Sequence, residues 1–409
     1  MTKAGTSHDI TALFGGIGGL ELGLGRAGHR ASLFCECDPE AVSVLRARFP
    51  DVPVTRDVRR TDELLATISP ESDLLTAGFP CTDFSQAGTT RGFEGGRSSL
   101  IIDTLALLER RRFANLLLEN VPNWRQLHRG AYMRHVVTAL EALGYRWAYR
   151  TIDARAFGLP QRRLRLFLFA TLEGDPREVL FHGDEIPDQR SFALHEAAHG
   201  FYWTEGKTGI GWGENCVPTL KGGSTVSIPS PPAILLKDGR VITPDVRDCE
   251  RLQGFPIGWT DLEDRCDAVG GGSFKQRRRW LLVGNAISVE VAQWIGERLA
   301  TRKPVTLEPG DALAADEPWP AAAWFDGTKR YRVPLGSWPV VRPSAPLETF
   351  LRFPGQPLSL RATQGFHKRI LASSLRFKPG FVHAIGLHLA RMEGATIGAP
   401  TSEPLPDAA

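Results

Sequence analysis

The chain has 409 residues, of which 23% are charged and 42% belong to the hydrophobic class, as is usual for a soluble globular protein of more than one domain. No apolar run reaches the length of a membrane span, and "MTKAGTSHDITALF" at the N-terminus lacks the pattern of a secretory signal. Six cysteines make no disulfide framework, and Cys35-x-Cys37 has no second pair to complete a zinc site. We therefore expect a cytoplasmic protein without a metal.

Residues 8–171 alternate between short apolar runs and amphipathic segments. This pattern predicts strands at 9–14, 31–36, 53–57, 72–78, 114–120 and 163–171. Helices are expected after the first glycine-rich segment and at 39–49, 98–112 and 132–144, the last ending at Gly144. Strand–helix alternation of this kind predicts an α/β fold, a Rossmann-like doubly wound, mostly parallel sheet with helices on both faces.

The second half of the chain is organised differently. Residues 172–246 are irregular and rich in Gly and Pro, but their Trp, Ile and Val argue against disorder. Residues 247–300 return to the first domain and end in an amphipathic helix at 286–300. Residues 301–323 have the composition of a linker, and 324–409 are expected to form a separate basic module.

The net charge of +3 hides an uneven distribution. From Lys329 to Arg391 the chain carries eleven Lys and Arg but a single acidic residue, Glu348. Basic segments are often solvated surface, but a surplus of this size is more typical of a polyanion contact.

Chemically capable residues follow five successive predicted strands. In order they are the glycines 15, 16, 18 and 19, then Glu36, Asp57, the pair Pro80-Cys81, and the pair Glu119-Asn120. Taken singly, the carboxylates could be solvated turn residues and Cys81 a buried apolar thiol. Ligands of open α/β sheets bind beyond the carboxyl ends of the strands, so together these residues predict a site.

The glycine segment "FGGIGG" indicates a ligand approached closely by the backbone. It is neither the GxGxxG dinucleotide fingerprint nor a phosphate loop with GK[ST]. Glu36, 17 residues after the last loop glycine, is placed to bind a ribose diol. The pattern favours an adenosine-containing ligand without a pyrophosphate, which describes S-adenosylmethionine.

Six segments between residues 8 and 300 resemble, in order, motifs of the DNA (cytosine-5) methyltransferase family. They are "ALFGGIGGLELGL", "GFPCTDFSQAG", "LENVPNW", "GLPQRRLRLFLFA", "ITPDVRDCERLQGFP" and "LVGNAISVEVAQWIG". The resemblance implies a class I methyltransferase fold, with the catalytic domain in 1–171 and 247–300. It also implies that 172–246 form a short target-recognition region.

The resemblance assigns the reacting groups. Cys81, preceded by Pro80, is the thiolate that adds to C6 of cytosine, which makes C5 reactive toward the methyl group. Glu119 engages the N3 edge of the base, and burial would favour its protonated form. Asn120 orients the Pro-Cys loop. The target base must leave the duplex, because its C6 face is stacked inside.

Arg163 and Arg165 resemble the family's base-clamping pair, with Arg165 reaching the cytosine O2. The alternative is two surface arginines on a half-exposed strand. The cofactor implied is S-adenosylmethionine, which leaves as S-adenosylhomocysteine. Its expected contacts are Phe14, Gly16, Gly18, Gly19, Leu20, Glu36, Asp57, Val58, Pro80, Leu100, Asn285 and Ala286.

Two residues depart from the family pattern, Ala12 in the first segment and Thr82 after the Pro-Cys pair, and neither is a reacting group. The recognition region is short, so we expect the basic module to share DNA binding with residues 212–240. The alternative is an accessory surface for a protein partner or for the nucleic-acid backbone alone. The expected DNA contacts are Ser85, Gln161, Thr219, Lys221, Lys368 and Arg369.

The leading interpretation is a prokaryotic, DNA-associated monomer that methylates cytosine in double-stranded DNA. We expect it to act within a restriction-modification or phage-defence system, with the cognate restriction or defence proteins as its partners. One alternative is an RNA cytosine-5 methyltransferase. Another is a catalytically silent DNA-binding regulator of the same fold, against which Cys81, Glu119, Arg163 and Arg165 count together. No membrane association is expected.

Overall fold

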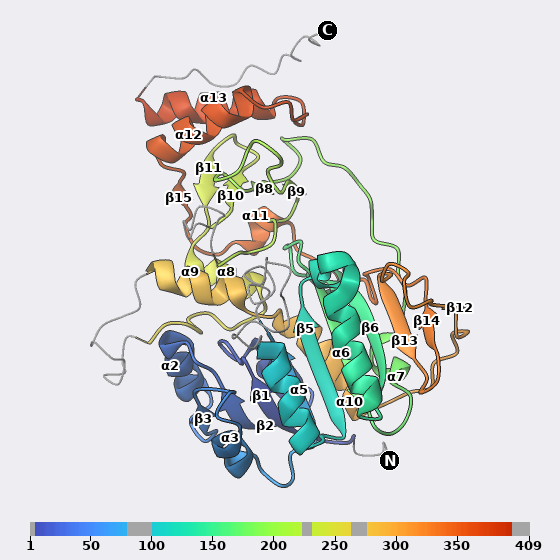
Figure 1. Cartoon of the computed structure of the whole chain (residues 1–409). Helices are drawn as coiled ribbons and strands as arrows, with labels where there is room; N and C mark the ends of the chain where they lie inside the picture. The colour runs from blue at the N-terminus through green and yellow to red at the C-terminus, as the bar shows by residue number, and fades with distance from the viewer. Residues whose placement is uncertain (1–4, 80–99, 223–230, 263–275, 395–409) are drawn as a thin grey trace.

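The computed structural model describes residues 5–79, 100–222, 231–262 and 276–394. They form a large lobe around a ten-stranded sheet and a small lobe around a five-stranded sheet (Figure 1). Across these four ranges, no helix has the length and apolarity that spanning a membrane requires.

One half of the large sheet is parallel. Its strands stand in the order β3-β2-β1-β4-β5, with bounds β1 Asp9–Leu13, β2 Arg30–Cys35, β3 Val54–Thr55, β4 Leu74–Gly78 and β5 Asn115–Asn120. Chain order reverses between β1 and β4. Such a switch point opens a crevice at the carboxyl edge of the sheet.

The other half of the sheet is mixed. β7 (Leu164–Thr171) is antiparallel to β5, and β6 (Arg146–Asp153) is antiparallel to β7. Next to β6 the sheet continues with β13 (Ala322–Phe325), β14 (Arg330–Arg332) and β12 (Asp311–Ala312). The Rossmann-like sheet expected from the sequence is thus confirmed, with an antiparallel extension that the sequence did not predict.

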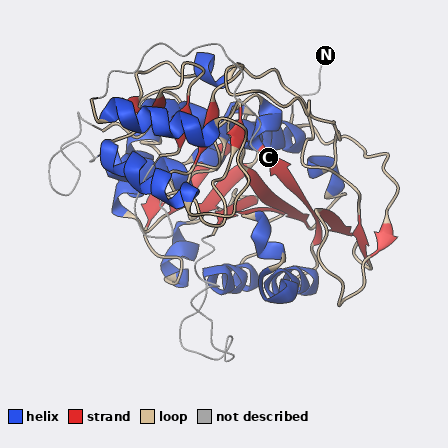
Figure 2. Cartoon of the chain, turned by 90° about the horizontal axis from the view of Figure 1, so that it is seen from above, coloured by secondary structure: helices blue, strands red, loops and turns tan. Residues whose placement is uncertain are grey.

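Helices cover both faces of this sheet, as the view from above shows (Figure 2). α1 (Gly19–Arg26), α7 (Arg177–Leu180) and α10 (Val289–Ala300) share one apolar core with it. α3 (Thr61–Thr67), α5 (Leu100–Arg110) and α6 (Ala131–Ala142) share another. α2 (Pro39–Arg48) begins where the Asp38 side chain accepts bonds from Glu40 N and Ala41 N, with Pro39 at the first helical position.

The sequence pattern did not predict β6, because polar residues interrupt the apolar run in "RWAYRTID". Arg150 in its middle is fully buried. Its guanidinium donates to the carbonyls of Gly183 and Gly336 and pairs with Asp184 at 3.0 Å, so its charge is compensated inside the fold.

The small lobe contains β8 (His199–Phe201), β9 (Gly213–Glu214), β10 (Ala233–Leu235), β11 (Val241–Thr243) and β15 (Gln356–Pro357), paired antiparallel. α12 (Leu360–Leu371) and α13 (Phe381–Met392) pack on this sheet. Phe201 stacks on Phe366 at 5.1 Å and meets Phe381 edge-on at 5.2 Å, measured between ring centroids. The C-terminal helices therefore supply part of the small lobe's core.

These pairings divide the C-terminal half differently from the sequence prediction. The expected linker 301–323 contains β12 and the start of β13, and the expected boundary at 324 cuts β13. Residues 322–332 belong to the large sheet, whereas β15, α12 and α13 belong to the small lobe. Strand pairing and apolar packing, neither of which composition reveals, join the basic segment to both lobes.

α8 (Val246–Leu252), α9 (Gln276–Asn285) and α11 (Leu347–Phe350) lie between the two lobes (Figure 1). α8 lies in the fifth family-like motif, and the sixth runs from the end of α9 into α10. α8 begins where Asp245 accepts a bond from Arg247 N.

Candidate active site at the carboxyl edge of the large sheet

The segment after β1 brings its backbone to the crevice in left-handed conformations. Phe14, Gly16 and Gly18 have φ of 56°, 54° and 77°. A Cβ on Gly16 would have nothing within 4 Å, so this glycine borders open space. A Cβ on Gly18 would lie 2.5 Å from Cε2 of Phe49, so the loop passes close to α2.

Gly18→Ala should destabilise the protein by roughly 1–2 kcal/mol, because alanine is strained at positive φ and would also overlap Phe49. Gly25→Ala is the matched control inside α1, the helix that Gly18 precedes. That site is exposed, with nothing within 4 Å of the added Cβ, and alanine should stabilise it by about 0.5 kcal/mol. Urea unfolding of both variants measures the difference, and equal stabilities would contradict this account of the loop.

Glu36 closes the crevice at the end of β2. One carboxylate oxygen accepts a bond from Gly16 N at 2.7 Å, and the other accepts from Asp38 N at 2.9 Å. The predicted ribose-binding acid thus lies directly against the glycine segment. Of the other predicted cofactor contacts, Leu20 and Val58 are buried in the apolar cores of the large lobe. Leu100 is half-buried at the first position of α5.

Asp57, beyond β3, is engaged by a neighbour. Its carboxylate pairs with Arg59 at 2.8 Å and accepts the Arg59 backbone N–H at 3.0 Å. The hydrogen bonds from Arg59 hold the pKa of Asp57 below its ordinary value. Asp57 is therefore an ionised acceptor at this edge.

Asn120 ends β5 and lies beside the start of the Pro-Cys loop. Its side-chain amide donates to the carbonyl of Phe79 at 3.2 Å, and its oxygen accepts from Val121 N at 2.8 Å. Asn120 is thus placed to hold the point where the chain enters that loop. Pro80, Cys81 and Ser85 lie outside the described residues.

Glu119 and Arg165 form the polar centre of the site. The carboxylate of Glu119 lies 3.0 Å from Nε of Arg165, and the two side chains are only 10% and 15% exposed. Burial raises the pKa of Glu119, against the opposing charges of Arg165 and Arg163. This edge therefore holds a sheltered carboxyl group that can carry a proton, beside a fixed guanidinium.

Arg163 has a different environment from Arg165, although the two are spaced to share a strand face. Its guanidinium is buried and donates to the carbonyls of Leu220, Gly284 and Ala286. Arg163 thereby ties the segment around Leu220 to the end of α9, where Asn285 is exposed and Ala286 buried. It supports the site through the backbone, whereas Arg165 reaches the buried carboxylate.

Three predicted DNA contacts have polar groups that are engaged within the protein, Gln161 in a buried position and Thr219 and Arg369 in half-buried ones. Gln161 is fully buried and binds Leu252 O and Leu220 N through its amide. The Thr219 hydroxyl donates to Arg162 O at 2.7 Å. Arg369 donates to Trp203 O and Glu205 O, which ties α12 to the loop after β8. The polar groups that suggested DNA contacts thus form hydrogen bonds with the protein's own backbone.

The other two described candidates remain on the surface. Lys221 pairs with Glu205 at 2.7 Å and lies over the Tyr202 ring at 3.8 Å. Lys368 is exposed on α12. Glu205 thus connects the loop bearing Lys221 with α12, through its carboxylate on one side and its carbonyl on the other.

Two arginines of α9 form ion pairs near the site that the sequence did not predict. Arg278 donates to the carboxylates of Asp38 and Glu40 at 3.2 and 2.7 Å, next to Glu36. Arg279 donates to Thr260, Asp261 and Glu250. Arg278 holds α9 against the turn after β2, and Arg279 holds it against α8 and the turn that follows α8. The run "QRRRW" was the available signal, but it reads equally well as solvated charge.

The comparisons with known proteins agree on one family. Residues 9–197 match the family model of the C-5 cytosine-specific DNA methylase. Type II methyltransferase M2.BsuMI of Bacillus subtilis (strain 168) is 42% identical over 386 residues, which cover 92% of this chain and 97% of the relative. Type II methyltransferase M.NlaX of Neisseria lactamica is 32% identical over 71% of this chain and 95% of its own length.

Among solved structures, the S. pombe Dnmt2 methyltransferase superposes with a TM-score of 0.54 at 15% sequence identity. The match covers 71% of this chain and 98% of that chain, and it shows a shared fold. Together with the M2.BsuMI match over nearly the whole length of both proteins, these findings place the chain in the family of C-5 cytosine-specific DNA methylases.

Proposed function

We propose that this protein transfers a methyl group from S-adenosylmethionine to C5 of a flipped-out cytosine in duplex DNA. The observation that carries the proposal is the sheltered Glu119–Arg165 pair on the same sheet edge as the Gly16–Glu36 contact. A proton donor for the base and a cofactor cradle would thus share one crevice.

The residues present fit S-adenosylmethionine, which would supply the methyl group as a sulfonium. Gly16 borders open space, so a ligand can approach its backbone. Glu36 and Asp57 provide carboxylate acceptors for the ribose hydroxyls and the adenine amino group. Phe14, Val58, Leu100 and the Asn285-Ala286 pair would complete the pocket.

Cys81 and Glu119 would act together on the base. The Cys81 thiolate adds to C6, and a proton from Glu119 to N3 removes the negative charge that this addition builds up. C5 then takes the methyl group. Loss of the C5 proton to water, return of the N3 proton to Glu119 and cleavage of the Cys81–C6 bond then restore the aromatic ring and the thiolate. Arg165 would fix Glu119 and bind the cytosine O2.

The setting that the relatives suggest is a Type II restriction-modification system, because M2.BsuMI and M.NlaX are both named Type II methyltransferases. A cognate restriction enzyme would then be the protein's partner in function. The methylated sequence would be the one that this enzyme cuts.

Incubation with labelled S-adenosylmethionine and either plasmid DNA or transfer RNA tests the activity. The proposal expects label in DNA, at C5 of cytosine within one short sequence. Label in RNA alone would favour an RNA methyltransferase. Binding of DNA without any transfer would favour a silent regulator.

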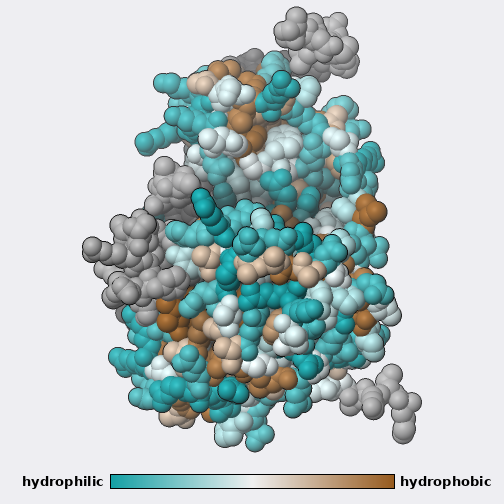
Figure 3. All heavy atoms as spheres, turned by 45° about the vertical axis from the view of Figure 1, so that its right-hand side comes forward, coloured by the Kyte–Doolittle hydropathy of each residue, from teal (hydrophilic) through white to brown (hydrophobic). Residues whose placement is uncertain are grey.

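The C-terminal segment would add contacts to the DNA backbone. No acidic residue occurs between Glu348 and Glu393. On α12, Arg361 and Lys368 are exposed, two helical turns apart on one face, and make no ion pair with a described residue. The face in Figure 3 is largely hydrophilic, with apolar side chains in scattered patches, which suits a polar partner better than an apolar one.

The double variant Arg361→Ala/Lys368→Ala should bind duplex DNA more weakly and with a flatter salt dependence. Each lost phosphate contact lowers the slope of log K against log salt by about 0.9. Lys329→Ala is the control, an exposed cation in the β13–β14 turn. Fluorescence anisotropy at several salt concentrations measures the slopes, and equal slopes for all three proteins would remove α12 from the interface. Point changes are preferable to deleting 324–409, because that deletion would cut β13.

A further inference from the structure

Residues 347–358, here called the docking strap, run from the lobe junction into the small lobe. The strap begins with α11 and ends with β15, which pairs with β11 at Ile242↔Pro357 and Thr243↔Gln356. α12 follows at once and packs into the small-lobe core. The position of the strap therefore fixes where one side of the small lobe lies.

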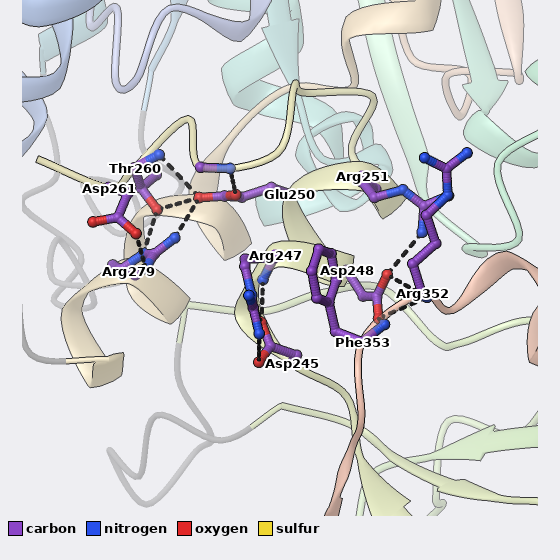
Figure 4. A network of polar contacts seen from close by, with 11 residues as sticks. Asp245, Arg247, Asp248, Glu250, Arg251, Thr260, Asp261, Arg279, Arg352 and Phe353 are labelled. Atoms are coloured by element: carbon purple, nitrogen blue, oxygen red, sulfur yellow. Dashed lines mark hydrogen bonds and ion pairs between the residues drawn. The ribbon is translucent and has the colours of Figure 1, made fainter.

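Asp248 of α8 holds the middle of the strap (Figure 4). Its carboxylate is fully buried and accepts the backbone N–H of Arg352 at 3.0 and 3.1 Å and that of Phe353 at 2.9 Å. Arg251 donates to the same carboxylate at 2.7 Å and compensates its charge. A buried carboxylate with three donors is a strong anchor.

The neighbouring arginines of α8 reinforce this anchor. Arg251 also donates to Phe350 O and covers the Phe350 ring at 4.3 Å. Arg247 covers the Phe353 ring at 3.8 Å. Three side chains of α8 thus bind residues 350–353 of the strap to one side of this helix.

The opposite side of α8 is bound to α9 and to the turn at residues 258–260, which Arg48 of α2 holds. Glu250, also fully buried, accepts from Gly258 N, Thr260 N and Arg279. Figure 4 shows Asp248 and Glu250 leaving the helix toward different partners. α8 therefore couples the strap, and through it the small lobe, to the helix that ends at Asn285 beside the active-site edge.

We propose that Asp248 is a positioning residue for target recognition. By fixing the strap, it sets the orientation of the small lobe over the sheet edge, and so the alignment of the target sequence with the reacting base. This inference rests on the proposed function, because it assigns DNA reading to the small lobe. It makes a C-terminal segment, outside the expected region 172–246, part of the recognition apparatus.

Asp248→Asn tests the role while keeping the side-chain shape. Asparagine accepts through one oxygen only, and its NH₂ group would face an N–H donor, so the strap loses a bond in a buried site. We expect the KM for cognate duplex to rise about tenfold, and discrimination against a duplex with one altered base pair to fall by a similar factor. The kcat at saturating DNA and the affinity for S-adenosylmethionine should stay unchanged.

Asp261→Asn is the control, a change of the same kind at a carboxylate that does not touch the strap. The ion pair with Arg279 that it weakens is partly exposed, and Arg279 keeps its bonds to Thr260 and Glu250. Hydrogen exchange should show faster exchange of the Arg352 and Phe353 amides in Asp248→Asn than in the control or the wild type. The assays are run below the unfolding transition of each variant.

The outcomes separate the two proposals. The positioning role would be overturned if the strap amides exchange faster while the KM for DNA and the discrimination between duplexes stay unchanged. A decrease in kcat alone would overturn it as well. If Asp248→Asn fails to fold, Phe353→Ala removes the ring under Arg247 and should shift KM and discrimination in the same direction. A wild-type protein without methyl transfer would refute the proposed function, a result distinct from either failure.

Discussion

Replacing Cys81 with serine is expected to abolish methyl transfer to DNA and to leave binding of S-adenosylmethionine unchanged. The serine hydroxyl has almost no anionic form at neutral pH, so it cannot add to C6 as the thiolate does. The cofactor contacts proposed at Gly16, Glu36 and Asp57 come from other strands and should be unaffected. Methyl transfer is measured with labelled cofactor, and cofactor affinity by calorimetry.

A duplex with 5-fluorocytosine at the target sharpens this test. Fluorine at C5 cannot leave as the proton does, so the wild type should remain covalently attached to the DNA on a denaturing gel. Cys81→Ser should form no such complex. Cys37→Ser is the control, an exposed thiol beside Glu36, and should still be trapped. Turnover by Cys81→Ser, or its trapping on the fluorinated duplex, would refute the role of the thiol.

Replacing Glu119 with glutamine is expected to lower kcat by about 10²–10⁴-fold, the usual contribution of a general acid. Glutamine preserves the shape of the side chain and its contact with Arg165, but it has no proton to give to N3. Binding of DNA and cofactor should change little. Single-turnover rates of wild type and variant give the comparison.

The pH dependence gives this prediction a second readout. Burial raises the pKa of Glu119, so its protonated form persists to higher pH than that of an ordinary carboxyl. As the pH rises through this elevated pKa, the acid form is lost and the wild-type rate should fall. Glu119→Gln should lack that alkaline limb. A variant with the wild-type profile would show that another group donates the proton.

The edge where the site lies could be predicted from the sequence because it depends on local order. Strands β1, β2, β4 and β5 are short apolar runs, and residues that directly follow parallel strands meet at one edge. The contact between Gly16 and Glu36 agrees with that reasoning. The positions of both residues could be predicted without knowing how distant parts of the chain fold.

The partners of polar side chains could not be predicted in this way. Gln161 and Arg369 were expected to contact DNA and Arg163 to clamp the base, yet each binds carbonyls from segments far away in the sequence. A sequence shows that a side chain can form hydrogen bonds, but not which backbone will satisfy it. Arg163 and Arg165 illustrate this limit of sequence analysis. They are two residues apart and were expected to share a strand face, but their side chains lie in different environments.

The pairing of β13 with β6 has a consequence for how the protein is made. The hydroxyl of Tyr149 on β6 donates to Pro320, which is 171 residues further along the chain. During synthesis, the β6 edge of the large sheet therefore stays uncovered until most of the chain has left the ribosome. Exposed strand edges invite pairing with other chains, and such long-range closure is slow. We expect the nascent protein to depend on chaperones until residues 322–332 close the sheet.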